Sequence, residues 1–126
     1  MTQPGHLASA PDRGAVLTKA ALRAAERLGI SGRLLADIVG VSEATVSRWK
    51  RNEAALAAGS KPFQMAALFV RTFRSLDAIT GGDEAVARAW MTAPNTALAA
   101  RPIERMVTVQ GLVDVTAYLD GRRAPI

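Results

Sequence analysis

The run of residues 42–51 holds the side chains with the most suggestive chemistry in this sequence. Arg48 can form a bidentate pair with guanine, Thr45 can meet a thymine methyl or a base edge, and Glu43 can accept from cytosine. Neighbouring hydroxyls and cations are better suited to phosphate oxygens. The residues that this reasoning predicts to contact DNA are Ser31, Ser42, Glu43, Ala44, Thr45, Ser47, Arg48, Lys50 and Arg51.

These side chains would reach bases only from a helix that enters the major groove, and residues 32–50 have the spacing of a helix-turn-helix. The first helix of that motif crosses the second closely, so the contact position needs a small residue, which is Ala36. Gly40 follows four residues later, where the turn needs positive φ, and Val46 stands six further to anchor the second helix. The alternative interpretation is a plain helical hairpin in which these residues only pack.

The distribution of charge favours a polyanionic partner for the first part of the chain. The net charge is +5, but residues 1–74 carry 11 Lys and Arg against 5 Asp and Glu, whereas residues 75–126 carry 5 against 6. The basic charge therefore belongs to the N-terminal part. We expect nucleic acid to bind there and a different partner to bind the near-neutral C-terminal part.

Catalytic and metal chemistry find little support in the composition. The sequence has no cysteine, and its single histidine, His6, lies in a segment without periodicity. The acidic residues show no convincing metal-ligand arrangement, so we expect no enzymatic activity, no cofactor and no metal. No apolar run approaches the roughly 18–20 residues that cross a bilayer, and no signal-like segment opens the sequence. A cytoplasmic protein is the expectation.

Helical periodicity and the scarcity of β-branched runs predict an all-α fold. Capping residues, prolines and glycines place the expected helices at residues 15–28, 32–39, 43–52, 61–79, 84–92, 102–107 and 112–119. The expected organisation is a flexible arm at residues 1–14, a helix-turn-helix domain at 15–79 and a small helical C-terminal domain at 80–126. The predicted N-terminal core consists of Leu34, Leu35, Ile38, Val46, Trp49, Leu68 and Phe69.

Residues 89–119, AWMTAPNTALAARPIERMVTVQGLVDVTAYL, carry a second pattern: a tryptophan helix, Pro-Asn, a leucine, a proline opening a short helix, a glycine and an apolar helix. The residues that carry it are Trp90, Pro94, Asn95, Leu98, Pro102, Met106, Gly111, Val115 and Leu119. This run resembles the toxin-binding domain of the Xre/MbcA/ParS family of antitoxins, which also carry an Xre-type helix-turn-helix in front. The chain departs from the family at residues 99–101, where a glycine usually follows the leucine and the proline comes one residue later.

The resemblance implies an antitoxin of a type II toxin-antitoxin pair, whose partner is a RES-domain toxin that degrades NAD. Such an antitoxin blocks access to the toxin's active site and represses its own operon by binding operator DNA. The residues it indicates as toxin contacts are Trp90, Asn95, Leu98, Tyr118, Arg122 and Arg123. The two arginines would lie in a free tail at the rim of the toxin's active-site cleft, paired with acidic groups there.

Helix-turn-helix proteins commonly bind two half-sites as dimers, so we expect a homodimer and a higher-order complex with the toxin. The main alternative is a stand-alone helix-turn-helix transcription regulator. Its C-terminal part would dimerise or sense a ligand, and the apolar residues after residue 80 would complete a core rather than hold a toxin.

Overall fold

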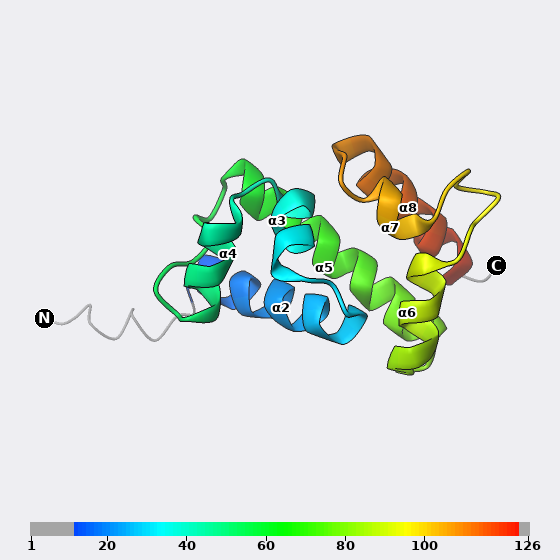
Figure 1. Ribbon diagram of the computed structural model, residues 1–126, viewed down its shortest axis with the longest axis horizontal. Helices are drawn as coiled ribbons and strands as arrows, with labels where there is room; N and C mark the ends of the chain where they lie inside the picture. Colours follow the sequence, from blue (N-terminus) through cyan, green and yellow to red (C-terminus); the bar gives the residue numbers. More distant parts are fainter. Residues whose placement is uncertain (1–11, 124–126) are drawn as a thin grey trace, which may run out of the picture.

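A computed structural model describes residues 12–123, which form helices joined by short loops (Figure 1). The helices are α2 (Arg13–Leu28), α3 (Gly32–Val39), α4 (Glu43–Lys50), α5 (Lys61–Ile79), α6 (Glu84–Thr92), α7 (Pro102–Arg105) and α8 (Val109–Arg123). The described residues contain no strand, only an isolated bridge between Asn95 and Ala100. The predicted all-α fold is confirmed. No helix in this range is both long and apolar enough to span a membrane.

Local capping explains most of the helix boundaries. Ser31, Ser42 and Ser60 each accept a hydrogen bond from a backbone N–H in the first turn of α3, α4 and α5. Asp83 does the same for α6, and Gly40 ends α3 in the left-handed conformation with φ 87°. These helices therefore begin and end close to the predicted positions.

The first helix begins earlier than predicted. The Asp12 carboxylate accepts hydrogen bonds from the backbone N–H groups of Gly14 at 2.9 Å and Ala15 at 3.3 Å, so the cap lies further upstream than expected. Gly14 is also tightly packed, because a Cβ there would lie 1.9 Å from the carbonyl oxygen of Leu56. The end of the predicted arm thus belongs to α2, and the rest of it, residues 1–11, lies outside the described residues.

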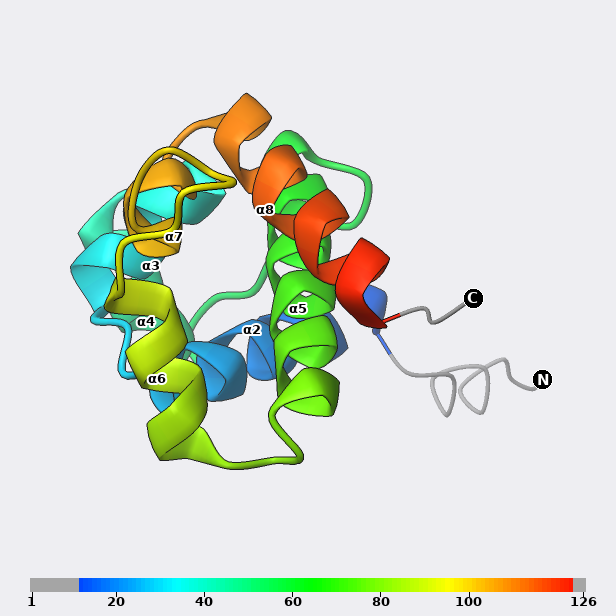
Figure 2. The same cartoon turned by 90° about the vertical axis from the view of Figure 1, so that its right-hand side faces the viewer.

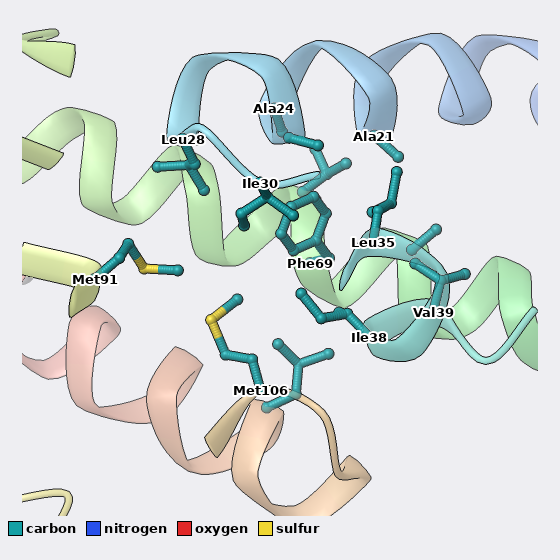
Figure 3. Close-up of a cluster of buried hydrophobic side chains, with 14 of the residues drawn as sticks. Ala21, Ala24, Leu28, Ile30, Leu35, Ile38, Val39, Phe69, Met91 and Met106 are labelled. Atoms are coloured by element: carbon teal, nitrogen blue, oxygen red, sulfur yellow. The ribbon is translucent and has the colours of Figure 1, made fainter. Parts of the chain in front are cut away.

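α5 is the central helix (Figure 2): it packs along both α2 and α8 and also contacts α3 and α6. Phe69 on α5 is fully buried and belongs to one hydrophobic cluster with side chains of the other helices. Figure 3 shows Met91 and Met106 pointing into the same cluster as Leu28 and Ile38. The hydrophobic core therefore continues across the predicted domain boundary that follows α5.

The predicted N-terminal core is largely correct. The predicted residues that are buried are Leu35, Ile38, Val46, Trp49 and Phe69. Leu34 and Leu68, in contrast, are only half-buried and pack at the margin of the cluster. Each precedes a buried residue on its helix, and successive side chains on a helix differ by about 100° around the axis. The side chain before the most buried one therefore lies at the edge of the core.

The last helix is longer at both ends than the glycines predict. Gly111 lies inside α8, where a Cβ would stand 1.7 Å from the carbonyl oxygen of Arg105. The missing side chain of Gly111 thus permits a close approach between the end of α7 and α8, and Gly111 does not separate two helices. At the other end, Asp120 accepts a hydrogen bond from Ser75 of α5 at 2.8 Å, and α8 continues to Arg123.

Two arginines fasten α6 to the end of α2. Arg88 donates hydrogen bonds to two carbonyl oxygens in the last turn of α2, those of Arg27 at 2.9 Å and Glu26 at 3.0 Å. Arg27 in turn forms ion pairs with Asp77 at 3.3 Å and Glu84 at 3.2 Å. These contacts join α2 to the C-terminal part of the chain.

Candidate functional sites

α3 and α4 have the helix-turn-helix geometry that the spacing predicts. Ala36 is buried where the helices meet, and its carbonyl oxygen accepts from the backbone N–H groups of Gly40 at 2.8 Å and Val41 at 3.0 Å. Gly40 supplies the left-handed turn that a side chain would resist. Val46 and Trp49 are buried beneath α4. The opposite side of α4 therefore faces outward.

The outward side of α4 holds the predicted base contacts. Glu43, Ala44 and Arg48 are exposed, while Thr45 and Ser47 are half-buried. Arg48 Nη2 donates to the Thr45 hydroxyl at 3.1 Å, and that hydroxyl lies 2.9 Å from the hydroxyl of Ser42, the residue that caps the helix. This chain of hydrogen bonds holds the Arg48 guanidinium toward the N-terminal end of α4, where a helix in the major groove meets base edges.

Two cations of α2 lie near Lys50, the last residue of α4. A hollow of about 570 Å³ lies at the start of α3. Its lining includes Lys19, Arg23, Ser31, Gly32 and Lys50. The structure thus brings the predicted phosphate contacts Ser31 and Lys50 together, whereas Arg51 is paired with Glu53 at 3.1 Å. Lys19 and Arg23 were not predicted as DNA contacts. The sequence showed only that the N-terminal part is basic, and it is the fold that brings these two residues of α2 to the same hollow as Ser31 and Lys50.

Three predicted toxin contacts form one stack between α6 and α8. The rings of Trp90 and Tyr118 lie 6.2 Å apart at an interplanar angle of 19°. The Arg122 guanidinium lies 5.8 Å from the centre of the Tyr118 ring, and Arg122 Nη1 donates to the Tyr118 hydroxyl at 3.1 Å. The prediction that Arg122 and Arg123 lie in a free tail is wrong, because both residues belong to α8.

The loop before α7 gives Asn95 and Leu98 roles inside the molecule. The Asn95 side-chain oxygen accepts from the Leu98 backbone N–H at 3.1 Å, and the Asn95 backbone bonds twice with Ala100. Leu98 is only 5% exposed, and its carbonyl oxygen accepts from Arg105 Nη1 at 2.7 Å. Leu98 is therefore a core residue in the described chain, and its predicted contact with the toxin stays a prediction. Both residues shape the loop.

Three exposed apolar side chains of the C-terminal part were not predicted from the sequence. Val107, Val109 and Val113 are large apolar side chains that are 43%, 58% and 42% exposed. Val109 and Val113 stand four residues apart on α8, so they lie on one side of the helix. The four-residue spacing was visible in the sequence, but it does not distinguish an exposed stripe from a buried one.

Two family models match the chain. Residues 8–57 match the antitoxin Xre-like helix-turn-helix domain, and residues 75–124 match the antitoxin Xre/MbcA/ParS C-terminal toxin-binding domain. The chain belongs to the Xre-type antitoxins. A comparison with curated proteins finds no match.

In this antitoxin, the matched ranges leave residues 58–74 between them, and this segment includes most of α5. Because α5 packs against both α2 and α8, the two family domains share one core. No group of three or more His, Asp or Glu side chains in residues 12–123 is arranged to hold a metal ion. The described surface carries the α4 face with its cations, the Trp90–Tyr118–Arg122 stack and the exposed valines.

Proposed function

We propose that this antitoxin neutralises a RES-domain toxin that degrades NAD, and that it represses its own operon by binding operator DNA as a homodimer. The observation that carries the proposal is the presence on one chain of an exposed, arginine-bearing helix-turn-helix face and a family toxin-binding domain. The RES identity of the toxin rests on the resemblance of residues 89–119 described above. We expect the antitoxin itself to have no enzymatic activity.

At the operator, α4 would enter the major groove with Arg48 facing the bases. A guanidinium already held by the Thr45 hydroxyl loses less freedom on binding guanine than an unrestrained one does. The cations around Lys50 would bind phosphates, which supply affinity without sequence preference. A second copy would read the second half-site, because one helix makes few base contacts.

At the toxin, the surface formed by Trp90, Tyr118 and Arg122 would supply the contact. The stacked rings offer rigid area that loses little conformational entropy on binding. Arg122 offers a guanidinium to acidic groups at the rim of the toxin's active site. Asn95 and Leu98 would act by fixing the loop beside this surface, since both are held by contacts within the chain.

Coexpression with the neighbouring open reading frame, followed by copurification, tests the partnership directly. NAD consumption by the copurified toxin is then titrated with wild-type antitoxin, Arg122→Ala, a chain lacking residues 122–126, and Lys61→Ala as an exposed control. We expect the Arg122 variants to inhibit less than wild type and the control to match it. All four should shift operator DNA equally when assayed without toxin.

Two results would contradict the proposal. If the neighbouring protein does not copurify, the partnership is refuted. If it copurifies but does not consume NAD, the partner is not a RES-domain toxin. Deletion of the antitoxin gene alone without loss of viability would favour the stand-alone regulator. Equal inhibition by wild type and both Arg122 variants would retain the partnership but move the toxin contact to another part of the C-terminal domain.

A further inference from the structure

A groove between α2 and α5 has no role in the proposed function. It encloses about 350 Å³, and its floor is apolar. The floor includes Val16, Leu17, Ala20, Phe63, Ala67 and Val70. Val16 is 55% exposed, so part of this apolar lining is open to solvent. An apolar floor at the bottom of a groove is typical of a binding surface.

Three arginines surround this floor. Arg13 and Arg74 lie along the groove with Arg71, and the lining contains no carboxylate. The Arg13 guanidinium stands 5.5 Å from the centre of the Phe63 ring, so its charge is held at the edge of the apolar surface. Arg71 is already paired with Asp120. Arg74 forms no ion pair with any residue in the described range of 12–123.

We propose that this groove binds an acidic amphipathic segment of another protein. Apolar side chains of that segment would cover Val16 and Phe63, and its carboxylates would pair with Arg13 and Arg74. Charge complementarity indicates the class of partner, because every charged side chain in the lining is an arginine and two of the three, Arg13 and Arg74, form no ion pair within residues 12–123.

A second copy of this chain fits the groove poorly. A two-fold dimer interface places the same surface of both subunits together, so the arginines of one copy would face those of the other. Nucleic acid also fits poorly, because phosphates and sugars would leave the apolar floor uncovered. The groove lies between α2 and α5, whereas the proposed DNA-reading side chains are on α4.

The test selects peptides from a random display library on the immobilised full-length protein. The enriched peptides are then synthesised with a fluorescent label, and their affinities are measured by anisotropy. Arg13→Gln and Arg74→Gln each remove one charge of the groove, while Arg101→Gln removes one exposed charge in the loop before α7 and serves as the control. We expect acidic, apolar peptides whose affinity falls about tenfold in each groove variant, the loss of roughly one charge-assisted pair, and stays unchanged in the control.

Four outcomes would overturn the proposal. The first is a library that yields no peptide sensitive to the groove variants, and the second is enrichment of neutral or basic peptides. The third is competition by nucleic acid. Duplex DNA would displace the labelled peptide from the wild-type protein, and it would bind the Arg74→Gln variant less tightly than the Arg101→Gln variant. The groove would then be a nucleic-acid contact. A dimer in sedimentation that Arg74→Gln alone dissociates would assign the groove to a second copy.

Discussion

Replacing Ala99 by glycine should stabilise this antitoxin, because Ala99 is held in the left-handed backbone region with φ 58°. Contacts of the neighbouring residues fix the backbone conformation at Ala99. Leu98 before it is buried, Ala100 after it bonds to the backbone of Asn95, and the Ala99 N–H itself donates to the carbonyl oxygen of Thr96 at 3.2 Å. Ala99 directly follows Leu98, and members of the family usually have a glycine shortly after this leucine.

The size of the effect follows from two opposing terms. An L-residue in the left-handed region costs roughly 1–2 kcal/mol, and glycine removes that cost. Glycine also increases the conformational entropy of the unfolded chain, which lowers the free energy of unfolding by about 0.4–1 kcal/mol. Ala99 is exposed, so its methyl contributes little packing. The expected net gain in the free energy of unfolding is about 1 kcal/mol, or a rise in Tm of roughly 3–5 °C for a chain of this size.

Thermal and urea unfolding followed by circular dichroism would measure the gain. Ala97→Gly is the matched control, because Ala97 is exposed in the same loop but is not among the described residues with positive φ. That variant should lose about 0.4–1 kcal/mol, since only the unfolded-state term acts. If Ala99→Gly destabilises the protein as much as Ala97→Gly does, the strain is absent and the reasoning about the shortened loop fails.

Three other predictions concern single contacts. Gly111→Ala should lower the free energy of unfolding by about 2 kcal/mol or more in urea titrations, because the new methyl would collide with the carbonyl of Arg105. Arg48→Ala should cost roughly 1–3 kcal/mol and relax preference at one base position, whereas Lys50→Ala should weaken binding to all sequences and reduce the salt slope by about 1. Binding across a salt series separates them, and a uniform loss for Arg48→Ala would make it a phosphate contact. Arg88→Ala should raise amide hydrogen exchange at the start of α6, since its bonds to the end of α2 are lost; unchanged exchange there would show that packing alone holds α6.

Local signals in the sequence were enough to predict most helix boundaries and the helix-turn-helix. A capping serine acts on backbone groups within its own first turn, so Ser31 and Ser42 can be interpreted without knowledge of the fold. Likewise, the offsets of Ala36, Gly40 and Val46 describe a contact between consecutive helices. Each of these features depends only on residues nearby in the chain.

The errors arise where the deciding contact comes from another element. Gly111 has the composition of a helix end, but its role depends on the carbonyl of Arg105 and the approach of α7 to α8. The motif contains a leucine at position 98, but only the path of the loop shows that the Leu98 side chain is buried. The C-terminal end of α8 depends in the same way on α5, through the contact of Asp120 with Ser75.

The single core also constrains how the two proposed activities are related. Val46 and Trp49 anchor the DNA-reading helix in the same cluster that holds Met91 and Met106 from the C-terminal part. A partner that contacts only exposed groups such as Arg122 need not move that cluster, so toxin binding and DNA binding can remain independent. A partner that shifts α6 or α7 must repack the cluster, since side chains in a close-packed interior cannot move separately. Any coupling between toxin and operator would therefore pass through the shared core under α5, and not through a flexible linker between two domains.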